Sequence, residues 1–143
     1  MEEERQKEYV TYDVAELIKE KKLYNFSYPH YFCYCKGKFV RTIEVETLDL
    51  MSIAYLAPHL YDMQRWLREV PNLSVEVYTN ASGWCWQVCK AFKHYSVTCG
   101  TWLDDFTNHF DEGLMNDGGS YDTYEAALNA GIKRALEIGF DRK

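Results

Sequence analysis

The chain has 143 residues, of which 47% are hydrophobic and 27% are charged, and its formal net charge is −6. Eight Gly and three Pro are too few, and the apolar content is too high, for a disordered or collagen-like chain. Domains cluster at about 100–150 residues, so we expect a single globular domain over residues 1–143. The net negative charge disfavours general binding to nucleic acid or to anionic membranes.

The N-terminal sequence Met1-Glu2-Glu3-Glu4 is acidic, and no apolar segment follows it. A secretory signal needs a basic start and an apolar run of about 7–15 residues, and a membrane helix needs about 20 apolar residues. We therefore expect a cytoplasmic protein without a membrane partner. We also expect residues 1–10 to form a frayed N-terminus. Five Cys, an odd number, fit reduced thiols in such a compartment.

In the first half of the chain, the spacing of apolar residues predicts a helix over residues 14–23. An aromatic-rich strand is expected over residues 30–35, followed by a turn at Lys36-Gly37-Lys38 and a partner strand over residues 39–45. Residues 48–56 are apolar without a clear period, and their structure is left open.

In the second half, Pro58 is expected to begin an amphipathic helix that buries Leu60, Met63, Trp66, Leu67 and Val70. Alternation predicts strands over residues 73–79 and 84–89 around a turn, with a further strand near residues 95–99. Residues 104–121 are acidic and poorly periodic, which favours a long loop, with a short helix near residues 102–110 as the alternative.

The final helix is predicted from a capping box, with Asp122 as N-cap and Glu125 three residues later, and it should stop at Gly139. The elements then follow the order α-ββ-α-ββ(β)-α. Hairpins favour antiparallel pairing, so we expect an α+β fold in which three helices pack on one antiparallel sheet of four to five strands.

A metal site is one possible use of the cysteines and histidines. Four cysteines lie in two predicted strands that could pair with each other: Cys33, Cys35, Cys85 and Cys89. Two histidines, His30 and His94, flank these cysteines and are further candidate ligands. Structural zinc sites usually place a C-x2–4-C pair on a turn that wraps the ion, and these strands lack such a turn. We therefore interpret the thiols as packed side chains and expect no cofactor.

Catalysis could use a Cys–His pair, either His94 with Cys89 or Cys99, or His30 with Cys33. It could also use the carboxylates of the acidic segment, namely Asp104, Asp105, Asp111, Glu112 and Asp117. No catalytic or phosphate-binding motif accompanies them, so no catalytic residue is assigned. A small enzyme or metal-dependent hydrolase stays the first alternative, and a nucleic-acid-binding module using the basic residues 19–22 and 36–41 stays the second.

Aromatic residues make up 16% of the chain, which is high. Most should lie in the core, but Tyr and Trp are also the usual anchors of protein interfaces. Tyr31 and Tyr34, or Tyr78 together with Gln87, occupy positions where one face of a hairpin could stay exposed. We expect these tyrosines to bind a protein partner or a second copy of the chain.

Two segments carry a resemblance to a known group of proteins: PHLYDMQRWLRE at residues 58–69 and YDTYEAALNAGIKRAL at residues 121–136. Both are similar to short proteins of prophages and mobile elements in gut bacteria of the Bacteroides type. The resemblance covers the second half of the chain, from Pro58 to its end, without the acidic segment 104–121. It implies a phage or mobile-element setting and a cytoplasmic location, and it implies no activity and no catalytic residue. The leading hypothesis is a non-enzymatic accessory domain that binds a protein or itself.

Overall fold

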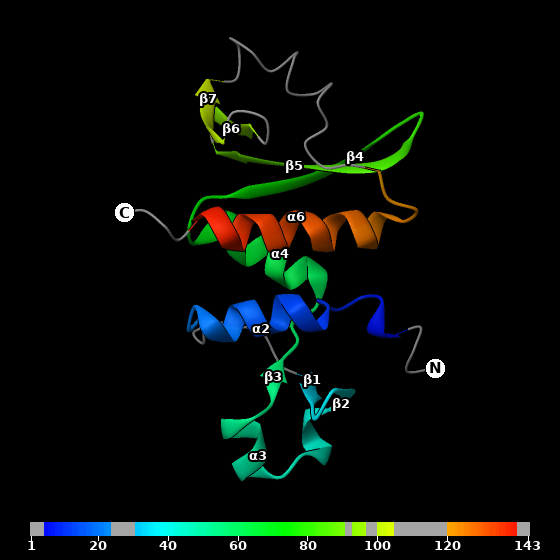
Figure 1. The fold of residues 1–143 in the computed structure, drawn as a ribbon, viewed down its shortest axis with the longest axis vertical. Coiled ribbons are helices and arrows are strands. Elements are labelled where there is room, and N and C mark those ends of the chain that lie inside the picture. The colour runs from blue at the N-terminus through cyan, green and yellow to red at the C-terminus, as the bar shows by residue number, and fades with distance from the viewer. Residues whose placement is uncertain (1–4, 24–30, 91–92, 97–99, 105–119, 140–143) are drawn as a thin grey trace. The chain divides into compact units, whose positions relative to one another are not determined.

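A computed structural model describes residues 5–23, 31–90, 93–96, 100–104 and 120–139 of the chain. Their helices and strands, with η1 a 3-10 helix, are α2 (Tyr12–Glu20), β1 (Phe32–Cys35), β2 (Lys38–Arg41), η1 (Thr42–Glu44), α3 (Thr47–Ser52), β3 (Tyr55–Leu56), α4 (Leu60–Glu69), β4 (Ser74–Asn80), β5 (Gly83–Lys90), β6 (Lys93–Ser96), β7 (Thr101–Asp104) and α6 (Tyr124–Gly139) (Figure 1). The α+β class is confirmed. The strands form two antiparallel sheets, β2-β1-β3 and β4-β5-β6-β7, where one sheet was expected.

Contacts within the chain group it into two compact units, Met1–Met63 and Gln64–Lys143. The boundary falls inside α4, between Met63 and Gln64. The single domain over residues 1–143 stays a prediction.

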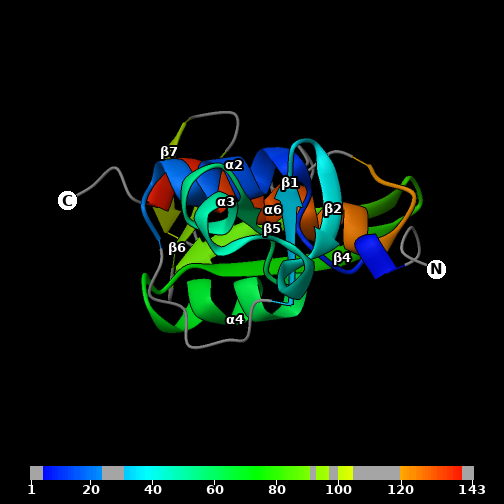
Figure 2. The same ribbon diagram turned by 90° about the horizontal axis from the view of Figure 1, so that it is seen from below.

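The sheet of the first unit is centred on β1, which pairs with β2 on one side and β3 on the other. Figure 2 shows β1 and β2 side by side, joined by a turn in which Gly37 has a φ of +81°. The predicted partner strand is shorter than expected, because the chain leaves β2 after Arg41 and continues as η1.

An aromatic cluster forms the core on one face of this sheet. The rings of Phe32 and Phe39 stack with their centroids 4.8 Å apart, and Tyr9 lies 4.9 Å from Phe32. Val10, in the segment expected to be frayed, is fully buried, and its N–H donates to the carbonyl of Pro58 over 3.1 Å. Residues 5–10 are therefore tied into the first unit by packing and by main-chain hydrogen bonds.

The segment left open by its lack of period forms α3 and β3. A helix of six residues makes fewer than two turns, so it is too short to show a periodic pattern. Lys19 of α2 holds the C-terminal end of α3 in place. Its Nζ donates hydrogen bonds to the carbonyls of Ser52 and Ala54, each over 3.0 Å.

Helix α4 begins at Leu60 and not at Pro58. The imidazole Nδ1 of His59 accepts the main-chain N–H of Tyr61 over 3.2 Å, so His59 acts as the cap of the helix. Four members of the predicted apolar stripe are buried: Leu60, Met63, Trp66 and Leu67. Val70 lies beyond the end of α4 and is 59% exposed, so its assignment to the buried stripe was wrong.

The second unit is built on the β4–β5 hairpin, whose register runs without interruption from Ser74 opposite Cys89 to Asn80 opposite Gly83. Helix α6 packs on one face of this hairpin (Figure 1). Gly131 lets the helix lie close to Val75 and Trp86, because a side chain at residue 131 would collide with them. The hydroxyl of Thr123 accepts the N–H of Ala126 over 3.1 Å, so Thr123 caps α6 in place of the predicted Asp122.

The sheet continues through a second hairpin, β6–β7, in which Gly100 has a φ of +72°. A strand near residues 95–99 was expected, and β6 lies slightly earlier, at Lys93–Ser96. Strand β7 at Thr101–Asp104 lies where a loop or short helix was expected. Most of the acidic segment 104–121 lies outside the described residues.

Candidate interaction surface

Tyr31 is the exposed member of the three tyrosines proposed as partner-binding residues, with 63% of its surface accessible. Its carbonyl accepts the N–H of Thr42 over 2.9 Å, which continues the β1–β2 pairing by one residue. Because side chains alternate along a strand, Tyr31 shares a sheet face with Cys33 and Cys35.

Tyr34 lies on the opposite face and is only 3% exposed, so the expectation that it binds a partner is corrected. Its hydroxyl donates to the carbonyl of Val10 over 2.9 Å and accepts from Nε2 of Gln6 over 3.3 Å. Burial raises the pKa of Tyr34, and the negative charge of Asp13 raises it further. The hydrogen bond from Gln6 lowers this pKa but does not cancel the effect of burial. Tyr31 and Tyr34 were expected where one face of the hairpin stays exposed, but residues three apart on a strand point to opposite faces, and the aromatic cluster covers the face that carries Tyr34.

Tyr78 belongs to the second unit and is half-buried on β4. It lies opposite Cys85 in the register, and Gln87 follows two residues later on the same face. Its pairing with Gln87 on one face is therefore as expected. Tyr31 and Tyr78 are in different units, and each is considered with its own surroundings.

A groove of about 350 Å³ lies beside the face of the first sheet that carries Tyr31. Three β1–β2 residues of this face, Cys35, Lys38 and Val40, line it. Its other lining residues come from the β1–β2 turn, from η1 and the segment after it, and from α3: Lys36, Glu44, Val45, Glu46 and Asp49. A second hollow of about 430 Å³ has both polar and apolar lining residues: Gln6, Lys7, Thr11, Tyr12, Tyr34 and Gly37.

Next to the groove, η1 and α3 expose large apolar side chains. Ile43 is 86% exposed and Leu48 is 75% exposed, and Ile53 at the end of α3 is also exposed. We call Ile43, Leu48 and Ile53 the apolar surface. Single exposed apolar residues are common, whereas exposed apolar residues that gather in one region mark interaction sites, and these three lie within eleven residues of the chain, 43–53. Leu48 and Ile53 lie in the segment left open for its lack of a period, whereas Ile43 lies in η1, where the predicted partner strand over residues 39–45 was expected to continue.

Lys19 positions the helix that carries Leu48. Besides its two hydrogen bonds to the end of α3, its Nζ lies 4.8 Å above the ring of Tyr55. A cation at the C-terminus of a helix also interacts favourably with the helix dipole. Lys19 is the first residue of the basic run 19–22 considered for nucleic acid, and here it serves a structural role.

The thiols expected to be packed are divided between the two units. Cys33 and Cys35 lie on β1, and Cys85 and Cys89 lie on β5. Strand β1 pairs with β2 and β3, whereas β5 pairs with β4 and β6, so the idea that the two Cys-bearing strands pair with each other was wrong. Burial, with a smaller effect of Cys35, raises the pKa of Cys33 to about 11, which makes this thiol a poor nucleophile.

Within the described part of the chain, no three His, Cys, Asp or Glu side chains lie close enough to hold a metal ion. His94 lies opposite Cys89 in the β5–β6 register. His30, Cys99, Asp105, Asp111, Glu112 and Asp117 lie outside the described residues. The expectations about metal and cofactor therefore stay predictions.

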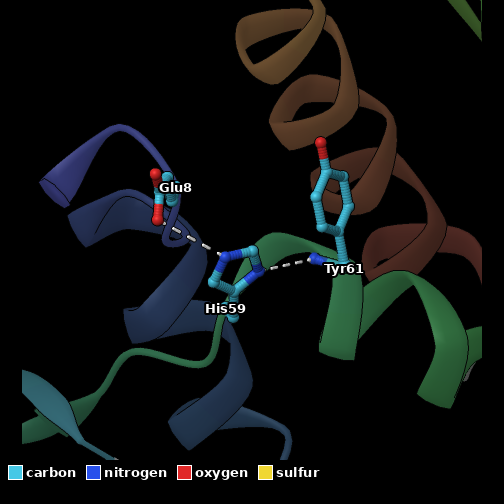
Figure 3. A network of polar contacts seen from close by, with 3 residues as sticks. All are labelled: Glu8, His59 and Tyr61. Carbon is cyan, nitrogen blue, oxygen red and sulfur yellow. Dashed lines mark hydrogen bonds and ion pairs between the residues drawn. The ribbon is translucent and has the colours of Figure 1, made fainter. Parts of the chain in front are cut away.

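One polar network joins the N-terminal segment to α4, and sequence analysis did not predict it. Nε2 of His59 lies 3.7 Å from Oε1 of Glu8, while Nδ1 accepts the N–H of Tyr61 (Figure 3). The rings of Tyr9 and Tyr61 lie 5.0 and 5.1 Å from the imidazole. Because Nδ1 accepts a main-chain hydrogen bond, the proton of the neutral ring lies on Nε2, facing Glu8. The network caps a helix and anchors the N-terminal segment.

No helix in the described ranges is long and apolar enough to cross a membrane. Comparison of the chain with protein-family models, with curated proteins and with solved structures gave no match. The resemblance to mobile-element proteins therefore stays a prediction.

Proposed function

We propose that this chain is a non-enzymatic protein-interaction module that binds a partner protein through the apolar surface and the adjacent groove of its first unit. The supporting observation is the exposure of Ile43 and Leu48, 86% and 75%, and Lys19 holds the end of α3, the helix that carries Leu48. Burial of a large apolar side chain by a partner stabilises the complex by about 1.5–3 kcal/mol for each fully buried residue.

The surroundings of the apolar surface indicate the chemistry of the partner. Three acidic residues, Glu44, Glu46 and Asp49, line the groove and outnumber its two basic residues, Lys36 and Lys38, and the whole chain carries a net charge of −6. A partner that combines apolar side chains with Lys or Arg would match both features, because opposite charges steer association and apolar contacts hold the complex. Tyr31, on the same sheet face as the groove floor, supplies an exposed aromatic ring of the type enriched at interfaces.

The biological setting forms part of the same proposal. The resemblance of residues 58–69 and 121–136 to prophage and mobile-element proteins supports an accessory role in such an element. A cytoplasmic partner in the bacterial host fits this role. The small enzyme and the nucleic-acid-binding module remain the alternatives from sequence, and no contact in the described residues favours either one.

The test is quantitative capture of proteins from nuclease-treated host cells by the tagged chain, read by mass spectrometry. The double variant Ile43→Asp, Leu48→Asp should lose the partner, because two charges replace the apolar contacts. Val70→Asp is the matched control, since Val70 is an exposed apolar residue outside the apolar surface. The proposal fails if the double variant, still folded by circular dichroism, captures the same proteins in the same amounts as the wild type.

A further inference from the structure

Strand β4 is an outer strand of the second sheet, whose order is β4-β5-β6-β7. It has seven residues, and its register with β5 is continuous, without a bulge. The outer side of such a strand presents main-chain N–H and C=O groups that can pair with another strand.

Two hydrogen bonds identify which β4 residues point outward. Nε2 of Gln64 donates to the carbonyl of Val75 over 2.7 Å, so this carbonyl points away from β5. On β5, the N–H and C=O of Trp84 bond to Tyr121 over 3.0 and 2.8 Å, and thus point away from Thr79, the β4 residue opposite. The direction alternates along a strand, so the outward residues are Val75, Val77 and Thr79.

Gln64 already satisfies the outward carbonyl of Val75. No hydrogen bond from the described part of the chain reaches the outward main-chain groups of Val77 and Thr79. Thr79 is exposed and Val77 is half-buried, so within the described part of the chain this stretch of the edge is accessible to a partner strand.

The other outer strands are short or protected by charge. Strand β3 has two residues, and β7 has four. Strand β2 has four residues, two of which are the exposed cations Lys38 and Arg41. Proteins guard strand edges with Lys, Pro, bulges, short length or a covering helix. Strand β4 has no Lys, Pro or bulge and only one charged residue, Glu76, and Gln64 of α4 covers its outer side at Val75.

We propose that β4 pairs antiparallel with β4 of a second copy of this chain, centred on Tyr78, to form a homodimer through a continuous sheet. Tyr78 then lies opposite Tyr78 of the partner subunit, and Val77 lies opposite Thr79 of the partner subunit. By symmetry Thr79 lies opposite the partner's Val77, so the two outward residues form about four main-chain hydrogen bonds across the axis.

Side-chain chemistry favours a second copy over an unrelated extended peptide. The register places an aromatic ring opposite an aromatic ring, which is a favourable cross-strand pair. Glu76 lies opposite Asn80 of the partner subunit, so the only charged residue of β4 meets a neutral amide and no like charges face each other. A register centred on Val77 would need the carbonyl of Val75, which Gln64 occupies.

Disulfide trapping in the full chain tests both the pairing and its register. Tyr78→Cys places two thiols at a non-hydrogen-bonded pair with Cα atoms about 4.5 Å apart, within the range that a disulfide spans. Glu76→Cys is the matched control, because its two copies are four residues out of register, about 13 Å apart. After mild oxidation, Tyr78→Cys should give a covalent dimer well above the wild-type background of five cysteines, and Glu76→Cys should not.

Sedimentation of the unmodified chain supplies the second measurement. The wild type should dimerise reversibly, and Thr79→Pro, which removes an outward N–H without touching the β5 pairing, should weaken the dimer by about tenfold or more. Asn80→Lys should strengthen dimerisation relative to Asn80→Glu, because the new charge faces Glu76 of the partner subunit. A wild type that stays monomeric, or equal crosslinking of Tyr78→Cys and Glu76→Cys, would overturn the proposal, even if β4 bound a peptide from another protein.

Discussion

The close contact between α6 and the β4–β5 hairpin leads to a quantitative prediction for Gly131→Ala. A Cβ atom at residue 131 would lie 2.7 Å from Cγ1 of Val75, and 3.1 and 3.2 Å from Cβ and Cγ of Trp86. Carbon atoms in contact prefer separations of about 3.5–4.0 Å, so the Val75 methyl would have to move by about 1 Å.

Two opposing terms set the size of the effect. Overpacking of a filled core costs about 1–3 kcal/mol. Replacing Gly by Ala in a helix gains about 0.8–1.0 kcal/mol of helix propensity. The difference predicts that Gly131→Ala lowers the free energy of unfolding by about 1 kcal/mol, although the same substitution on an exposed helix face would raise it.

Urea unfolding followed by far-ultraviolet circular dichroism measures this change. Ala126→Gly, at an exposed position of α6, reports the propensity term in the same helix. Val75→Ala removes the methyl that the new Cβ would meet, so Gly131→Ala should cost less in that background than in the wild type. An increase in stability of about 1 kcal/mol for Gly131→Ala alone, with no coupling to Val75, would refute the close packing of α6 on the hairpin.

Three further predictions concern single side chains. Lys19→Met should lower the free energy of unfolding by about 1–3 kcal/mol in urea titrations, because it removes charged hydrogen bonds to Ser52 and Ala54; an unchanged midpoint would show that these bonds contribute nothing. The native pKa of Cys33 is about 11 against an ordinary value of 9.0, so its contribution to stability is present below pH 9 and is lost as the pH rises to 11. Cys33→Ala should therefore lose less stability than the wild type between pH 9 and 11, and equal losses in the two proteins would contradict this. The buried Nε1 of Trp86 has no hydrogen-bond partner among the described residues, so Trp86→Phe should change the free energy of unfolding by less than about 1 kcal/mol. Trp86→Ala should lower it by about 3–5 kcal/mol, and similar losses for both variants would contradict the reasoning.

The sequence determined those elements whose pattern repeats over several residues. The alternation of residues 73–79 and 84–89 predicted the β4–β5 hairpin, and the apolar spacing after Tyr124 predicted α6. These patterns are local, since a strand repeats every two residues and a helix every 3.6, so they are visible without knowledge of the rest of the molecule. The ends of the elements were less certain, as the cap at Thr123 shows, because a neighbouring hydroxyl and carboxylate compete for the same role.

Tertiary structure decided which faces are covered and which strands pair. Tyr31 and Tyr34 were expected together on an exposed face of the hairpin, but the packing of the N-terminal segment buries Tyr34, while Tyr31 stays exposed on the other face. Similarly, nothing local separates Cys33 and Cys35 from Cys85 and Cys89, yet their strands join different sheets. The short helix α3 and its exposed Leu48 had no pattern to reveal them, because a segment of six residues is held by contacts such as those of Lys19 and not by its own period. Periodicity identifies a face from neighbouring residues, whereas burial of that face depends on segments far away in the chain.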